Sequence, residues 1–421
     1  MKIAVLAVVP ALILADTIIA LARGWRSDSR LDGAVLAFAA VWLLVLGFTV
    51  ASVRGRSYIN RIAGKLVLSL GSFLVAWMVA EVVTTTTAKS WMEVPFHLHY
   101  PKLSKVFRPS PGLMPGIEGE SSFTTNVRGV RGPELPPRKA AYRILCVGGS
   151  TTMCTYLDDT ETWPHLLMQT MNDRKTGQQC WVGNIGLSGY AAPHHLRFVQ
   201  ESELMEELDC LIFLIGVNDL TRTLIQNNDL EPKSLAETSP PRWRSSNVLE
   251  LARRVWKWRA ETRADWIEDE AGDSYLRRRS RRQAGALSDE LPSLHSALDE
   301  YAERLREMIA VCNSHRVRPV FVTQPVLWHK SLDESARPLL WLGWLKDGRY
   351  LTAARLADGM QQFNDRLKAV CTDANCLCID LTPMNGQLEF FYDDCHLNEA
   401  GAREVTRRIV ERLTTSDDVA W

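Results

Sequence analysis

The sequence predicts an α/β protein: a three-layer α/β/α domain built on a parallel central sheet and preceded by N-terminal transmembrane helices. Three observations lead to this prediction. Apolar residues are concentrated in residues 1–83, short apolar runs alternate with helical patterns from residue 142 onward, and polar residues follow several of those runs. Strands that are apolar along their whole length and separated by helices are typical of parallel sheets covered on both faces.

Three apolar stretches open the chain, at 3–22, 33–53 and 66–83. A helix needs about 20 apolar residues to span a bilayer, so we expect about three transmembrane helices in 1–83. Two alternatives are buried core helices and, for the first stretch, a signal peptide that ends near Ala20-Leu21-Ala22. Glu81, in the third stretch, is either an interfacial residue or a functional intramembrane carboxylate.

The positive residues between these stretches indicate an orientation. The loop after the second stretch carries Arg54, Arg56, Arg61 and Lys65, and the loop after the first carries Arg23, Arg26 and Arg30. Loops with more Lys and Arg tend to stay in the cytoplasm. We therefore expect an integral membrane protein whose domain after residue 83 is extracytoplasmic, with the lipid bilayer as a partner.

The rest of the chain divides into a connector and one large domain. Residues 84–141 are rich in Pro and Gly, which favours turns and extended chain. We expect residues 142–421 to form the large domain, with an insertion near 221–294 that is rich in Trp and Arg. The insertion is a lid, a basic amphipathic helix on an anionic membrane, or a solvated segment packed on the main domain. Its apolar positions at helical spacing are Val248, Leu251, Ala252 and Val255.

Five apolar runs predict the strands of the sheet, and four longer segments predict helices between them. The runs are 143–147, 181–184, 210–215, 320–323 and 376–379, and the helical segments are 162–171, 296–312, 353–371 and 398–413. Ligands of parallel α/β sheets bind beyond the carboxyl ends of the strands. The polar residues that follow each run are therefore the candidates for a site.

A serine follows the first run, in the sequence Gly148-Gly149-Ser150-Thr151-Thr152. This position between a strand and a helix exposes a side chain at the edge of the sheet. A serine hydroxyl is a weak nucleophile until a base activates it. Ser150 is therefore the candidate nucleophile, and an ordinary Gly-Ser turn is the alternative.

Two further segments offer donors for an oxyanion. The second run is followed by Asn-Ile-Gly-Leu-Ser-Gly, which ends at Gly189, and the third by Gly-Val-Asn-Asp, which contains Asn218. A backbone N–H at a glycine and an Asn amide are both suitable donors for acyl transfer. Gly186 is an alternative to Gly189.

The last segment supplies an acid–base pair. Asp393 and His396 are three residues apart, so one turn of helix would place them on the same face. The carboxylate could then orient the imidazole toward a nucleophile. Asp394 competes for the orienting role, and the alternative bases are His194, His195 and His329. A metal site formed by Asp393, Asp394 and His396 is also considered, but it lacks further ligands at suitable spacing.

Taken together, these segments resemble the SGNH/GDSL hydrolase family. The matching blocks are GGSTT, NIGLSGY, GVND and DDCHLNEAG, within about 143–413, and the segment 123–132 is similar to the lead-in of membrane-tethered members. The resemblance implies that Ser150 is the nucleophile, His396 the general base and acid, and Asp393 its orienting partner. It also implies an oxyanion hole made by the N–H groups of Ser150 and Gly189 and the amide of Asn218. One departure is Gly149, where the family motif has aspartate.

The expected function is serine-dependent hydrolysis of acyl esters through an acyl-serine intermediate. The substrate would be an acylated small molecule or glycan, carrying short O-acyl groups outside the cytoplasm. Acyl transfer by the same triad and a catalytically silent membrane-bound binding module are the alternatives. The formal net charge of zero gives no sign of a nucleic-acid partner. The proposed chemistry needs no cofactor or metal, and the sequence does not indicate an oligomeric state.

Overall fold

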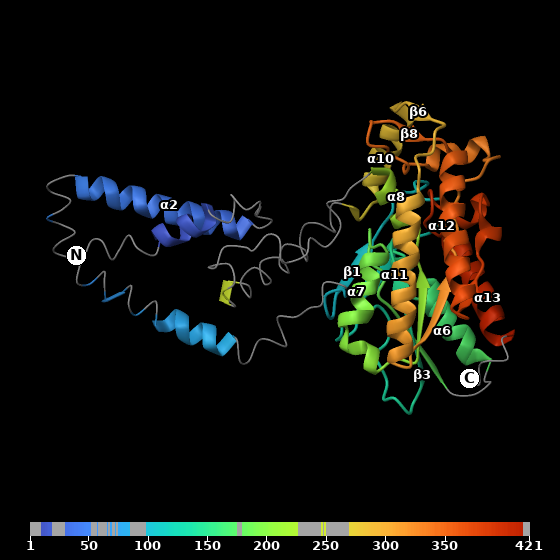
Figure 1. Cartoon of the computed structure of the whole chain (residues 1–421), viewed down its shortest axis with the longest axis horizontal. Coiled ribbons are helices and arrows are strands. Elements are labelled where there is room, and N and C mark those ends of the chain that lie inside the picture. Colours follow the sequence, from blue (N-terminus) through green and yellow to red (C-terminus); the bar gives the residue numbers. More distant parts are fainter. Residues whose placement is uncertain are drawn as a thin grey trace. The chain divides into compact units, whose positions relative to one another are not determined.

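The computed structural model describes residues 10–18, 30–51, 57, 65, 68–69, 72, 75–84, 98–174, 179–225, 246, 248–249 and 269–415. The chain forms two compact units, each described here by itself. The first comprises Met1–Val94 and Glu231–Asp265, and the second comprises Pro95–Leu230 and Trp266–Trp421. The second unit contains the sheet and all of the candidate site residues (Figure 1).

The centre of the second unit is a parallel sheet with the strand order β4-β3-β5-β7-β9. Its strands are β3 (Tyr142–Gly148), β4 (Cys180–Asn184), β5 (Cys210–Leu214), β7 (Arg318–Val322) and β9 (Leu377–Ile379). Each strand coincides with one of the five apolar runs, which confirms the predicted parallel sheet. In β5 all five residues are buried, and the rings of Phe213 and Phe321 stack with centroids 4.8 Å apart. Such continuous burial is possible because both faces of the sheet are covered.

The helices of the second unit form two groups. They are α5 (Ser150–Met153), α6 (Trp163–Asp173), α7 (Ala192–Glu201), α8 (Val217–Ile225), α10 (Asp273–Ala284), α11 (His295–Ser314), α12 (Ala353–Asp373) and α13 (Glu399–Thr415), with short 3-10 helices at Glu203–Glu206, Glu334–Leu339, Thr382–Met384 and Leu388–Phe390. Helix α6 packs against α13, whereas α11 packs against α7 and α12 (Figure 1).

This grouping follows from the order of the strands. The chain moves from β3 outward to β4, and then returns past β3 to β5 and on to β7 and β9. Crossovers between parallel strands are almost always right-handed, so reversing the direction places the connecting helices on opposite faces. The direction changes between β3 and β5, and ligands of such sheets bind at that switch point.

The segment before the sheet is folded into the second unit. Strands β1 (Ser104–Phe107) and β2 (Ser121–Thr124) pair antiparallel. Farther along, Arg131 and Asn184 exchange both backbone N–H to O bonds, each 2.9 Å long, beside the edge strand β4. Segment 98–141 therefore covers one edge of the sheet and brings Arg131 close to the residues that follow β3.

The later part of the predicted insertion also belongs to the second unit. Helix α10 contains an arginine run at residues 277–282, in which only residue 280 is not arginine. The two-residue strands β6 (Leu287–Ser288) and β8 (Tyr350–Leu351) pair in parallel. The other predicted features of the insertion lie mostly outside the described residues. These include Leu251, Ala252 and Val255. All nine cysteines of the chain lie in the second unit and are free thiols.

The described residues of the first unit are mainly helical. Helix α2 spans Arg30–Ala51 and covers most of the second apolar stretch, and residues 10–18 and 75–84 are also helical. Within the part of the chain that is described, no helix has both the length and the apolar character needed to cross a membrane. The remainder of the three apolar stretches lies outside that part. Glu81 accepts a hydrogen bond of 2.8 Å from the Ser246 hydroxyl and one of 3.3 Å from the Val248 N–H.

Candidate active site

The residues singled out by the motifs come together at the carboxyl end of the sheet. Ser150 begins α5 directly after β3, and Asn218 lies in the first turn of α8 after β5. Gly189 lies in the loop between β4 and α7, and His396 lies in the loop before α13. Ser150 and Asn218 therefore flank the switch point between β3 and β5, where the topology favours a ligand site.

Ser150, His396 and Asp393 form a continuous chain of hydrogen-bonding contacts. Ser150 Oγ lies 2.7 Å from His396 Nε2, and His396 Nδ1 lies 2.6 Å from Asp393 Oδ2. With Nδ1–H donating to the carboxylate, Nε2 is free to accept the serine proton, and this tautomer is inferred from the contacts. These are the contacts that a nucleophile, a base and an orienting carboxylate require.

The carboxylate of Asp393 is completely buried and well supplied with donors. Its Oδ1 accepts the backbone N–H groups of Cys395 at 3.0 Å and His396 at 2.8 Å, and its Oδ2 also accepts from Trp341 Nε1 at 2.9 Å. Burial alone would raise the pKa of the Asp393 carboxyl, but His396 and the hydrogen bonds outweigh it and hold that pKa below its ordinary value. Asp393 is therefore kept ionised beside the imidazole.

The neighbouring Asp394 has a different set of partners. Its Oδ1 accepts from Trp328 Nε1 at 2.7 Å, and its Oδ2 accepts the backbone N–H of Trp341 at 2.6 Å. Burial and repulsion from Asp393 raise the pKa of the Asp394 carboxyl to about 6. Of the two aspartates considered from sequence, Asp393 contacts His396 Nδ1, whereas Asp394 fixes the loop that carries Trp341.

Aromatic rings surround the imidazole of His396. The Tyr392 ring is stacked on it with centroids 5.5 Å apart, and the Trp341 ring is nearly parallel to it at 6.5 Å. Tyr275 meets it edge-on at 6.2 Å. Sequence reasoning missed Trp341 and Tyr275, because they come from segments with no recognised motif. Tyr392 is adjacent to the Asp393 motif and could have been found from that position.

The geometry distinguishes the two glycines considered as oxyanion donors. The Gly186 N–H already donates to Asn184 Oδ1 at 2.8 Å. Gly189 is exposed and has a φ of +77°, a value that favours glycine, and its N–H makes no recorded hydrogen bond within the described chain. The N–H of Ser150, at the start of a helix, likewise has no intrahelical acceptor. Gly189 and Ser150 thus have N–H groups available, whereas Gly186 does not.

The third predicted donor, Asn218, is held in place by the same loop. Its Nδ2 donates to the carbonyl of Tyr190 at 2.7 Å, which leaves the second amide hydrogen free. A Cβ atom added to Gly149 would lie only 2.4 Å from Asn218 Nδ2. The departure from the family motif at Gly149 therefore gives the Asn218 amide the space that it occupies.

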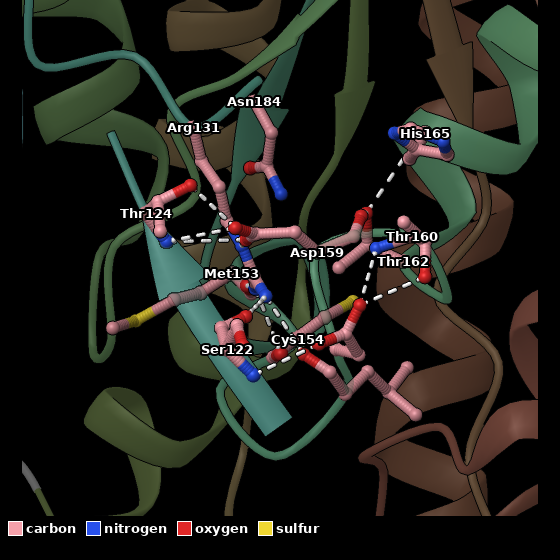
Figure 2. A network of polar contacts seen from close by, with 12 residues as sticks. Ser122, Thr124, Arg131, Met153, Cys154, Asp159, Thr160, Thr162, His165 and Asn184 are labelled. Atoms are coloured by element: carbon pink, nitrogen blue, oxygen red, sulfur yellow. Dashed lines mark hydrogen bonds and ion pairs between the residues drawn. The ribbon is translucent and has the colours of Figure 1, made fainter. Parts of the chain in front are cut away.

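A buried arginine, Arg131, bonds to the end of the short helix that begins at Ser150. Figure 2 shows Arg131 beside Met153 and Cys154. Arg131 is only 3% exposed, and its Nε pairs with Asp159 at 2.7 Å. Its remaining donors bond to four backbone carbonyls, those of Ser122, Met153, Cys154 and Leu157, at 2.6–3.1 Å. Two of these carbonyls close the short helix α5 that begins at Ser150. Sequence patterns assign Arg131 no role beyond its place in the segment 123–132.

The alternative histidine bases lie apart from this chain of contacts. Burial and the neighbouring His194 lower the pKa of His195 to about 3, and burial and Arg222 lower the pKa of His194 to about 4. His329 Nδ1 accepts from the backbone of Ser331 at 3.2 Å. Among the described residues, none of these three histidines has a recorded contact with Ser150.

One group of side chains is close enough to hold a metal ion. Among the described residues, the ligand atoms of Asp393, Cys395 and His396 all lie within 4.8 Å of one another. However, both ring nitrogens of His396 are already engaged, by Asp393 and Ser150. Burial raises the pKa of the Cys395 thiol well above its ordinary value, so that it stays protonated. A metal would have to displace the serine contact, and thiols bind metals as thiolates. These donors therefore fit proton transfer better than metal binding.

Several solved structures are similar to this chain at low sequence identity. LAE5, an α/β hydrolase from the metagenome of Lake Arreo, Spain, has 14% identity and a TM-score of 0.37, covering 65% of this chain and 95% of its own. A catalytic mutant of Axe2, an acetylxylan esterase from Geobacillus stearothermophilus, has 14% identity and a TM-score of 0.39, covering 66% and 96%. The acetyl xylan esterase AlAXEase has 12% identity and a TM-score of 0.36, covering 64% and 99%.

Sequence comparison gives a more specific result. No curated protein matches the chain significantly. The family model of GDSL-like lipases and acylhydrolases, in contrast, matches residues 146–404. This match begins within β3, just before Ser150, and extends past His396 into α13, so that it includes every predicted site residue. Because it spans more than half of the 421 residues, the chain belongs to the GDSL-like lipase/acylhydrolase family, as an ester hydrolase of the SGNH type.

Proposed function

We propose that this protein hydrolyses acyl esters through a covalent acyl-Ser150 intermediate. The observation that carries the proposal is the series of contacts from Ser150 Oγ to His396 Nε2 and from His396 Nδ1 to Asp393. A nucleophile within hydrogen-bond distance of a base, itself oriented by a third group, is the signature of nucleophilic catalysis.

In the first step, Ser150 Oγ attacks the carbonyl carbon of the ester and its proton passes to His396 Nε2. The buried carboxylate of Asp393 stabilises the imidazolium that forms. The negative charge on the carbonyl oxygen is stabilised by the N–H groups of Ser150 and Gly189 and by the free amide hydrogen of Asn218. The tetrahedral intermediate then collapses, the carbon–oxygen bond to the alcohol breaks, and His396 protonates the departing oxygen.

In the second step, water replaces the alcohol. His396 takes a proton from the water molecule, and the water oxygen attacks the acyl carbon. When the intermediate collapses, the bond to Ser150 Oγ breaks, His396 returns the proton to Ser150, and the acid is released. If a sugar hydroxyl entered in place of water, the same residues would transfer the acyl group. Hydrolysis and transfer therefore differ in the acceptor and not in the roles of the three side chains.

We further propose that the enzyme is anchored in a membrane and acts outside the cytoplasm on short O-acyl groups, including those on glycans. The three apolar stretches in 1–83 and the distribution of Lys and Arg between them support this location. In α2, the large apolar side chains of Phe38, Val41, Leu44 and Val45 are each more than half exposed, as expected of a helix that faces lipid. Extraction of membranes at alkaline pH tests the anchor: the chain should remain in the pellet, and release into the supernatant would contradict it.

The test of the chemistry is turnover of p-nitrophenyl acetate by the purified full chain, together with labelling by a fluorophosphonate probe. Both signals should be present in the wild type, and both should be lost in Ser150→Ala, with kcat reduced by at least about 10³-fold. His396→Ala should also lose turnover. A folded Ser150→Ala protein that retained wild-type turnover would overturn the proposed mechanism.

A further inference from the structure

The arginine run in α10 contains side chains of two kinds. Arg279 and Arg282 are buried and use their donors on backbone carbonyls. Arg279 donates to Leu113 at 2.7 Å and to Tyr392 at 2.9 Å, and Arg282 donates to Leu351 at 2.6 Å. These two arginines attach α10 to loops of the site, since Tyr392 directly precedes Asp393. They account for only part of the positive charge of the run.

Arg278, directly before Arg279, is exposed and lies on the aromatic rings of the site. Its guanidinium carbon lies 4.7 Å from the centre of the Trp341 ring and 5.5 Å from that of Tyr275. Among the described residues, no ion pair or side-chain hydrogen bond is recorded for Arg278. Contact with a ring face leaves the N–H groups at the edge of the guanidinium available to a ligand.

The Trp341 ring links this guanidinium to the reacting groups. Trp341 is half-buried, its Nε1 donates to Asp393 at 2.9 Å, and its ring is nearly parallel to the His396 imidazole at 6.5 Å. Arg278 and His396 thus both contact the Trp341 ring. Because His396 protonates the departing oxygen, the alcohol part of a bound ester lies beside the imidazole and extends toward this exposed positive charge.

We propose that Arg278 and Trp341 form a binding subsite for an anionic group on the molecule that carries the acyl ester. The inference rests on the proposed esterase function and adds the substrate class: an acylated molecule with a carboxylate or a phosphate near the ester. A guanidinium with free edge donors matches both anions, because it can bind two of their oxygens at once.

The experiment compares charged and neutral esters of the same shape. The substrates are 4-acetoxybenzoate, its neutral methyl ester and 4-acetoxyphenyl phosphate, each assayed with the full chain at low ionic strength. Arg278→Gln should lower the ratio of kcat/KM for the charged over the neutral ester by roughly threefold to tenfold, as expected for a direct ion pair at a solvent-exposed site. In the wild type, the preference for the charged over the neutral ester should decrease at high salt, because salt screens exposed charges.

Arg277→Gln is the matched control, since this exposed neighbour on α10 has no recorded contact with the aromatic rings among the described residues. It should leave the wild-type ratio unchanged. A phosphate monoester carries nearly twice the charge of a carboxylate, so an effect of Arg278→Gln on the phosphate that exceeds the square of its effect on the benzoate would identify the anion as a phosphate. A larger effect on the benzoate would identify a carboxylate. Identical ratios in wild type and Arg278→Gln, with p-nitrophenyl acetate still hydrolysed, would overturn the subsite alone. Absence of p-nitrophenyl acetate turnover and Ser150 labelling in the wild type would overturn the esterase function as well.

Discussion

At the scale of single residues, the site depends on Gly149, because glycine has no side chain. Gly149 leaves room for the Asn218 amide, which a Cβ atom would approach to 2.4 Å. We expect Gly149→Ala to displace that amide and lower kcat about 10²-fold, as the loss of one oxyanion donor does, with a smaller change in KM. Steady-state kinetics on p-nitrophenyl acetate would measure it. Unchanged kcat would mean that Asn218 does not stabilise the oxyanion.

Trp341 gives a prediction about pH. Its indole N–H lowers the pKa of the Asp393 carboxyl, so removing that donor should raise the pKa of Asp393. The ionised carboxylate would then be more basic and would stabilise the neighbouring imidazolium more strongly. We therefore expect Trp341→Phe to shift the acidic limb of the pH–kcat profile to higher pH and to lower the maximum about tenfold.

A matched control for this variant is Trp344→Phe, because Trp344 packs against Tyr350 instead of Asp393. Its pH profile should coincide with that of the wild type. The interpretation of Trp341 as a donor to the carboxylate would fail if both variants had the wild-type acidic limb.

The sequence identified those site residues that lie in short local patterns. Asp393 and His396 are three residues apart, and His396 Nδ1 does lie 2.6 Å from the Asp393 carboxylate. The segment that carries them is a loop, however, and not the expected turn of helix. Trp341 donates to the same carboxylate from 52 residues away in sequence, through a contact made only after folding. No local spacing encodes such a contact, so it could not be predicted.

At the scale of elements, the position of Ser150 depends on how α5 is held at its other end. Arg131 closes this four-residue helix by donating to the carbonyls of Met153 and Cys154. Arg131→Lys keeps the charge but has too few donors for all these acceptors. We expect it to lower the free energy of unfolding by about 3 kcal/mol, as when buried hydrogen bonds to a charged group are lost, and to slow fluorophosphonate labelling of Ser150.

Labelling measured well below the unfolding transition separates the two effects. Arg128→Lys serves as the control, because Arg128 is an exposed residue paired with Glu207. It should change neither stability nor labelling noticeably. A destabilised Arg131→Lys protein that is labelled at the wild-type rate would limit Arg131 to a role in stability.

The same contrast between local and distant information explains which elements were predicted. The strands of the sheet were found because each is a short apolar run bounded by polar residues. Strands β1 and β2 lie in a segment rich in Pro and Gly, whose composition indicates only turns. Helix α10 was not predicted, because its many arginines give it no apolar face with helical spacing. Two of these arginines are nevertheless buried, because backbone carbonyls of distant loops accept their hydrogen bonds. Burial of a charged residue depends on such partners and is not visible in periodicity.

At the scale of the whole molecule, the strand order brings two connections together at the site. The loop after β4 supplies Gly189 and leads into α7, and the turn after β5 supplies Asn218 and leads into α8. Asp219 joins them, since its Oδ1 accepts the backbone N–H of Ala192 at 3.0 Å. Its other oxygen has no hydrogen-bond partner among the described residues. The junction of α7 and α8 therefore contains a carboxyl that is only half satisfied.

This carboxyl should make the stability of the fold depend on pH. Burial, only partly offset by the Ala192 N–H, raises the pKa of Asp219 to about 6, against about 3.9 in an unfolded chain. The folded state thus binds the proton more tightly, and its contribution to stability is present below pH 4 and is lost as the pH rises through 6. Asp219→Asn has no such proton to lose. Between pH 4 and pH 7, we expect the wild type to lose about 2 kcal/mol of unfolding free energy relative to this variant, measured by urea titration. Parallel pH dependence in the two proteins would show that Asp219 titrates in the folded state as it does in the unfolded chain.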